Sequence, residues 1–161
     1  MIKIRWRHCL AFVVPLVTVS VGTLGATPSA AALEYSADAV SVSRALTLVN
    51  QERAEAGCSS LRVVPGLQTP AQRQSGDQAA RDGFGHNGAD GSTVDTRLSG
   101  LGYSRWGENV VQAQSAPAAV HFWSHSPRHR ANMLNCVFTQ TGLAMARSDS
   151  GRRYWTQTFG G

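Results

Sequence analysis

The stretch VHFWSHSPRHR, residues 120–130, carries three of the chain's five histidines, each four residues from the next. His121, His125 and His129 would form one stripe if a single helix carried them all. Pro127 breaks such a helix, because a proline removes a backbone hydrogen bond and drives the preceding residue out of helical geometry. We therefore predict one helix that ends near His125 and a second helix that begins at Pro127.

The two sides of this break differ in what they offer chemically. His121 and His125 have the H-x-x-x-H spacing of a zinc metalloprotease helix, but Phe122 occupies the position of the required glutamate base, so we interpret them as partly exposed helix histidines. His129 falls in the first turn of the second helix, where unpaired N–H groups and the helix dipole disfavour the charged imidazolium. A neutral ring can accept a proton or bind a metal, so His129 is a candidate site residue.

The N-terminus has the three parts of a secretory signal peptide. MIKIRWRH is basic, residues 9–26 carry no charge, and Ala30 to Ala32 give an A-x-A exit. We predict a signal peptide over residues 1–32, a loose leader over 33–39 and one domain over 40–161. An uncleaved membrane anchor is the alternative, although Pro15 and Gly22 interrupt the apolar stretch. The expected protein is secreted, with no stable membrane span after cleavage.

The remaining chain excludes some partners and suggests a crosslink. Removing the three basic residues of the predicted signal peptide leaves 12 basic and 10 acidic residues, and a net charge of +2 is too weak to indicate nucleic-acid binding. Two cysteines remain, Cys58 and Cys136. In an oxidising compartment two thiols usually pair, so we predict a disulfide between them; two unrelated buried thiols are the alternative.

Apolar periodicity and turn signals divide the domain into helices and strands. Predicted helices cover 40–57, 69–83, a short stretch within 90–103, 115–125 and 126–135, and predicted strands cover 106–114 and two segments of 139–161 around the turn Ser148 to Gly151. Thr69 and Ser115 are the expected caps of their helices, and Ser92 with Asp95 has capping-box spacing. This order predicts an α+β fold, an α-β-α sandwich with a small antiparallel sheet flanked by helices.

Several motifs together resemble the CAP superfamily, the SCP-like or cysteine-rich secretory protein domains, in its bacterial secreted branch. They are VNQERAEAGCSSL, FGHNGADGSTVDTRL, GYSRWGENV, FWSHSPRHRANMLNC and YWTQTFG, in this order over residues 43–160. The combination of G-E-N with W-x-x-S-P-x-H-R is specific. The resemblance implies an α-β-α sandwich, an extracellular location, and a central cleft where two histidines and acidic side chains can bind a divalent metal such as zinc.

Three residues match the cleft motifs of this family. His86 matches the histidine after the second helix, Glu108 the glutamate of G-E-N, and His129 the histidine of the S-P-x-H-R segment. Where eukaryotic members place a second glutamate, this chain has Gly91, and Asp90 is the nearest acidic residue. The three residues would supply the three ligands of an open zinc site. The alternative is a buried hydrogen-bonded network that orders the fold without metal.

The function expected from this pattern is an extracellular binding module for a divalent metal and for a lipid or cell-envelope component. A metal-dependent or serine-type hydrolase is the alternative, with His129 or Glu108 as the base and water, Ser124 or Ser126 as the nucleophile. A purely structural interaction domain would leave the cleft empty. The chain has no G-x-S-x-G elbow, zincin motif or phosphate loop, which favours binding over catalysis.

Overall fold

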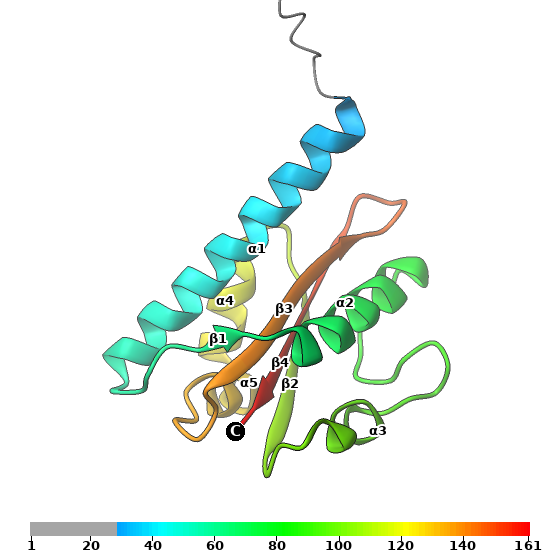
Figure 1. Cartoon of the computed structure of the whole chain (residues 1–161). Coiled ribbons are helices and arrows are strands. Elements are labelled where there is room, and N and C mark those ends of the chain that lie inside the picture. The colour runs from blue at the N-terminus through cyan, green and yellow to red at the C-terminus, as the bar shows by residue number, and fades with distance from the viewer. Residues whose placement is uncertain (1–28) are drawn as a thin grey trace, which may run out of the picture.

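The computed structural model describes residues 29–161 as helices packed around a four-stranded sheet (Figure 1). The elements in chain order are α1 (Ala30–Glu55), β1 (Arg62–Val63), α2 (Pro65–Ala80), α3 (Val94–Leu98), a 3₁₀ turn (Ser99–Leu101), β2 (Trp106–Gln112), α4 (Ala116–His125), α5 (Pro127–Met133), β3 (Gln140–Arg147) and β4 (Arg153–Gly160). The predicted α+β class is confirmed. Among these residues, not one helix combines the length and apolarity needed to cross a bilayer.

The sheet is mixed and has the strand order β1-β3-β4-β2. The pairs β2–β4 and β3–β4 are antiparallel, as expected, but β1 runs parallel to β3. No sequence pattern indicates β1, because a two-residue strand has too few side chains to show alternation. Its pairing places the chain so that α2 can start directly after it at Pro65.

Helices cover both faces of the sheet (Figure 1). On one face, α2 binds β4 through Gln78 Nε2 to Thr156 Oγ1 (2.9 Å) and Thr158 Oγ1 to the Leu67 carbonyl (2.9 Å). The other face packs against α1, α4 and α5. Its apolar core is made of Ala45, Val49, Leu61, Val111, Ala116, Ala119, Val120, Trp123, Met133, Phe138, Leu143, Trp155 and Phe159. This arrangement is the predicted α-β-α sandwich.

The helix boundaries confirm the predicted break at Pro127. α4 ends at His125 with Ser115 as its N-cap, and α5 begins at Pro127 after Ser126, so the three histidines do not share one helix. The expected cap of α2 at Thr69 is wrong. α2 starts four residues earlier, because Pro65 occupies the first helical position and Gly66 continues the helix.

The third helix also starts differently from the prediction. Thr93 is its N-cap and forms a reciprocal capping box with Thr96, in place of the predicted pair Ser92 and Asp95. Threonine side chains can make the same two bonds to the backbone as the serine and acidic pair.

Residues 33–39 are not the loose leader predicted from the sequence. This segment is helical, since α1 begins at Ala30 and is capped by the Ser29 hydroxyl, which accepts from the Ala32 N–H at 3.2 Å. Alanines are the strongest helix formers, and an ion pair between Arg147 and Asp38 (2.6 Å) ties this part of α1 to the end of β3. Residues 1–28, most of the predicted signal peptide, lie outside the described residues.

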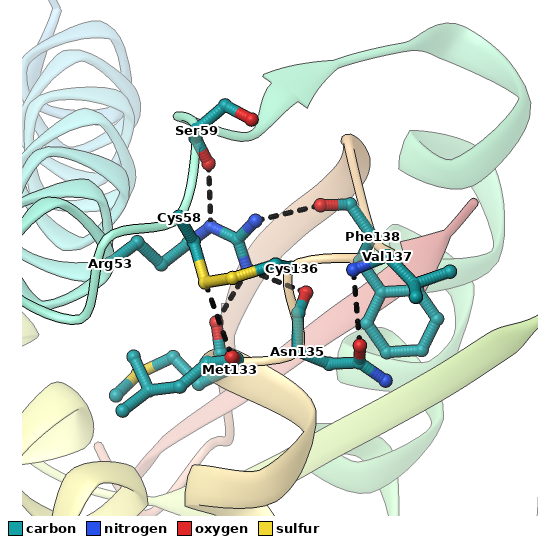
Figure 2. The surroundings of a disulfide bond; sticks show 9 residues. Arg53, Cys58, Ser59, Met133, Asn135, Cys136, Val137 and Phe138 are labelled. Carbon is teal, nitrogen blue, oxygen red and sulfur yellow. Dashed lines mark hydrogen bonds between the residues drawn. A yellow bond between two sulfur atoms is a disulfide. The ribbon is translucent and has the colours of Figure 1, made fainter.

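The predicted disulfide is confirmed. Cys58 and Cys136 are bonded, with their Cα atoms 4.9 Å apart, and join the segment after α1 to the segment after α5 (Figure 2). Arg53 lies beside the bridge and is fully buried. Its guanidinium donates to the carbonyls of Ser59 (2.9 Å), Met133 (2.7 Å), Asn135 (3.1 Å) and Phe138 (2.7 Å). Burial lowers the pKa of Arg53 from its ordinary value.

Candidate functional site

The candidate site lies at β2, which is at the edge of the sheet formed by residues 29–161 and pairs with β4. Neighbouring side chains on a strand point to opposite faces, so Glu108 and Asn109 of W-G-E-N-V reach different elements. Glu108 reaches α3 and the loop after α2, while Asn109 reaches α5. The G-E-N motif therefore connects the two histidine-bearing segments across one edge of the sheet.

Glu108 is a buried carboxylate, 4% exposed, with two protein partners. Its Oε1 accepts from His86 Nδ1 at 2.9 Å, and its Oε2 accepts from Arg97 Nη2 at 2.8 Å. A buried carboxylate without partners would be very costly, and the Arg97 ion pair offsets that cost. Both oxygens are thus engaged by side chains of this chain.

Arg97 on α3 is the site residue that sequence reasoning missed. Its Nη2 also donates to the His86 carbonyl (2.8 Å) and its Nη1 to the Ser92 carbonyl (2.9 Å), so one guanidinium fixes both the loop and the carboxylate. Its side chain is only 4% exposed. No local pattern in VDTRL distinguishes such an arginine from a solvated one on a short helix.

His86 lies on a loop that α2 holds through hydrogen bonds from Gln74. Gln74 Nε2 donates to the Gly85 carbonyl at 2.6 Å and to the Asn87 carbonyl at 3.4 Å, on either side of the histidine. The His86 side chain is 49% exposed. Because a carboxylate can only accept, Nδ1 of His86 is the donor to Glu108, and in the neutral ring Nε2 keeps a free lone pair. This is the arrangement in which a carboxylate orients an imidazole for a proton or a metal.

His129 lies in the first turn of α5 and is half-buried. Burial lowers the pKa of His129 below its ordinary 6.5, and the positive charge that His86 can carry lowers it further. The neutral ring expected from the sequence is therefore supported, although burial is the main cause rather than the helix dipole. Among the described residues, the buried Nδ1 of His129 has no hydrogen-bond partner.

Two asparagines set the position of His129 relative to Glu108. Asn109 Nδ2 donates to the His129 carbonyl at 2.8 Å. Asn132 Nδ2 donates to Asn109 Oδ1 at 3.0 Å and to the Glu108 carbonyl at 3.2 Å. Gly107 permits this contact, because a Cβ there would lie 3.1 Å from Asn132 Oδ1. The strand motif thus holds the first turn of α5 through backbone and amide groups.

Asp90, the acidic residue nearest to Gly91 in sequence, is held by two other residues. Its carboxylate accepts from Arg73 Nη2 at 2.6 Å and from the Ser92 N–H at 3.0 Å. The hydroxyl and the backbone N–H of Ser92, followed by Arg73, lower the pKa of Asp90 to about 2. Over residues 29–161, no three His, Cys, Asp or Glu side chains are arranged as a ready metal-binding group.

His121, His125 and Ser124, which is one of the two candidate serine nucleophiles, belong to α4, and the other candidate, Ser126, lies between α4 and α5. The rings of His121 and His125 lie 3.9 Å apart between centroids. His125 Nδ1 lies 2.9 Å from the His121 carbonyl, so it carries a proton and cannot accept one from Ser124 Oγ, which is 3.1 Å away. Ser124 and His125 therefore do not form a nucleophile and base pair through this contact.

The comparisons with known proteins agree with this architecture. The sequence profile of the cysteine-rich secretory protein family, the CAP domain, matches residues 46–159. The chain belongs to this family. It is 34% identical over 119 residues to the uncharacterized protein YkwD of Bacillus subtilis (strain 168), and the match covers 72% of this CAP-domain chain and 45% of YkwD. The chain thus spans less than half the length of that relative.

Solved structures of bacterial proteins show the same fold. An extracellular protein containing an SCP domain from Bacillus anthracis str. Ames matches with a TM-score of 0.69 at 25% identity, over 84% of this chain and 45% of that one. An outer surface protein from Borrelia burgdorferi matches with a TM-score of 0.65 at 15% identity, over 71% and 87% of the two chains. The second likeness shows the fold alone.

Proposed function

We propose that this CAP domain is an extracellular binding module in which His86 and His129 bind a divalent metal such as zinc. The observation that carries the proposal is the contact between Glu108 and His86 Nδ1, which leaves Nε2 of a half-exposed imidazole free. The lowered pKa of His129 keeps a second imidazole neutral close by. Neutral imidazole nitrogens are preferred ligands of zinc.

The donors present fit a two-histidine site better than the three-ligand set expected from the sequence. Both oxygens of Glu108 are already engaged by His86 and Arg97, so this carboxylate would orient His86 rather than bind the metal. A zinc ion held by two protein nitrogens would supply open coordination positions for an oxygen-bearing ligand. The chain's own part is to keep both rings neutral and correctly turned.

Exposed aromatic rings beside the site support a ligand that is partly apolar, such as a lipid or a cell-envelope component. Phe122 is 45% exposed and its ring lies 5.5 Å from that of His129. Phe84 is 60% exposed and lies two residues before His86. Large apolar side chains next to polar groups are typical of binding surfaces. The substitutions Phe84→Ser and Phe122→Ser should weaken adsorption to purified cell walls or liposomes without changing zinc binding.

Zinc calorimetry on the metal-free protein, with the disulfide intact, tests the metal site. His86→Ala and His129→Ala should each abolish measurable zinc uptake. Glu108→Gln should weaken it by about 10- to 100-fold, because the orienting carboxylate is lost. His125→Ala is the matched control and should bind as the parent does. Zinc uptake that depends on His125 and not on His86 would reverse the assignment.

Metal affinity should also depend on pH. The ligating imidazoles must be unprotonated, so affinity should fall below about pH 6. An affinity that stays constant from pH 8 to pH 5 contradicts histidine ligation.

A hydrolase is the second candidate, and the same His86–Glu108 pair supports it. A carboxylate-oriented imidazole is the usual general base for activating water. Two observations favour binding instead: Ser124 contacts a histidine nitrogen that carries a proton, and the carboxylate of Asp90 is engaged by Arg73 and Ser92. Esterase, peptidase and glycosidase assays on the zinc-loaded sample, with His86→Ala as the control, separate the two functions.

A further inference from the structure

The outer edge of β3 is covered over only part of its length. β1 pairs with Gln140 and Thr141 and then ends, because Pro65 begins α2 two residues after Val63. β3 continues to Arg147. Within residues 29–161, the second half of this strand therefore has β4 on one side and no strand on the other.

The hydrogen bonds around β3 show which backbone groups face outward. Thr141 accepts from the Val64 N–H on the β1 side, and both backbone groups of Leu143 bind the Gln68 amide, with Leu143 N to Oε1 at 3.0 Å and Nε2 to the Leu143 carbonyl at 2.9 Å. On a strand, every second residue presents its N–H and C=O to the same side. Met145 is therefore the next residue whose backbone donor and acceptor face outward.

Gln68 acts at Leu143 as one residue of a neighbouring strand would, by accepting and donating in turn. Met145 has no equivalent partner: within residues 29–161, no hydrogen bond joins its backbone N–H or C=O to a group outside the sheet. The outer edge of β3 is thus satisfied at Thr141 and Leu143 and open at Met145.

A groove of about 490 Å³ follows this open edge between α1 and α2. Val42 and Leu46 of α1, Val63 of β1 and Met145 itself contribute apolar walls. The groove also contains Asp38, whose ion pair with Arg147 lies at the far end of β3. It is separate from the polar site, since its lining includes neither His86, Glu108 nor His129.

We propose that this groove binds an extended segment of a partner polypeptide, which adds to β3 as an outer strand beyond β1. An open backbone donor and acceptor with apolar walls on either side are the two features that β-strand addition requires. An acyl chain would contact the apolar walls of the groove but leave the backbone N–H and C=O of Met145 without partners. The amide of Gln68 already shows that this edge accepts strand-like bonding.

The test uses a synthetic probe, acetyl-Lys-Val-Thr-Val-Thr-Val-Lys-amide, carrying a fluorophore and titrated by anisotropy against the purified protein. Two further probes carry N-methyl groups, one on the valines and one on the threonines. Only alternate amides of an added strand face β3, so one methylated probe should bind about tenfold more weakly and the other nearly as well as the parent. Equal affinities of all three probes, or no binding of the parent, overturn the proposal.

Two variants and one further measurement locate the bound probe. Met145→Pro removes the outward N–H while leaving the pairing with β4, and it should weaken the parent probe more than Met145→Ala, which shortens the apolar wall but keeps the N–H. If Met145→Pro melts early, amide exchange on the parent protein replaces it, and the Met145 N–H should exchange more slowly with probe bound. His86→Ala should bind the probe normally, which separates this groove from the proposed metal site. Met145 protection that instead follows protein concentration, without probe, would identify a second copy as the occupant and overturn the proposal.

Discussion

Replacing Arg53 by methionine should destabilise the domain strongly while leaving its fold intact. Methionine keeps the apolar stem and removes the guanidinium, which makes four hydrogen bonds: one to Ser59 just after α1, and three to the segment between Met133 and Phe138 (Figure 2). No carboxylate pairs with this buried cation among the described residues, so backbone carbonyls compensate for its burial.

The expected magnitude follows from the carbonyls left behind. Two of the four bonds, to Met133 and Phe138, are fully buried, and a buried acceptor without a partner costs about 1 to 3 kcal/mol. The variant no longer has to desolvate a charge, which offsets part of this loss. We expect a net loss of about 3 kcal/mol in the free energy of unfolding, against about 5 to 15 kcal/mol for a typical domain.

Urea denaturation of the oxidised protein measures this loss, followed by fluorescence of the buried tryptophans Trp123 and Trp155. Arg44→Met is the matched control, because Arg44 is an exposed arginine on the same helix, and it should change stability by less than about 0.5 kcal/mol. A loss below about 1 kcal/mol for Arg53→Met, with an unchanged dependence on urea, would refute the reasoning.

Three further perturbations test other parts of the structure. Reducing the bridge between Cys58 and Cys136, which are 78 positions apart, should lower the melting temperature, because chain entropy assigns such a loop up to about 4.5 kcal/mol; two titratable thiols in secreted, denatured protein would contradict the bridge. Gly142→Ala should cost about 3 kcal/mol in urea denaturation, because its Cβ would collide with the Leu67 carbonyl group; near-parental stability would show that α2 can shift. The Ser148 hydroxyl is the main cause that lowers the pKa of Asp82, followed by the Tyr154 hydroxyl, so the ionised Asp82 stabilises the fold above about pH 3.8 and this stabilisation is lost as pH falls. In Asp82→Asn, the free energy of unfolding should therefore decrease less between neutral and acid pH than in the parent. The same decrease in both proteins would contradict this prediction.

Features fixed by a few neighbouring residues could be predicted from the sequence. The end of α4 and the start of α5 follow from Pro127, and the cap of α4 follows from Ser115. The β3–β4 hairpin follows from its turn near Gly151, which adopts a positive φ of 80°. The disulfide follows from compartment and cysteine count.

Features set by distant contacts could not be predicted. The parallel strand β1 exists because Arg62 and Val63 meet residues almost 80 positions later, which local patterns do not encode. Arg97 belongs to the site because Glu108 needs a buried counter-ion, and nothing near Arg97 in sequence announces this. Asp90 is the acidic residue nearest in sequence to Gly91, where eukaryotic members have a second glutamate, yet its carboxylate is held by Arg73 and Ser92.

The position of the bridge also determines how the protein responds to a cut backbone. His86, Glu108 and His129 all lie between Cys58 and Cys136 in the sequence, so the disulfide encloses every residue of the candidate site in one covalent loop. A protease that cleaves once inside this loop, for example in the exposed stretch around Asn87, leaves both pieces joined by the sulfur atoms. Such a nicked molecule would run as one band on a non-reducing gel and as two after reduction, while both imidazoles stay attached to the same particle.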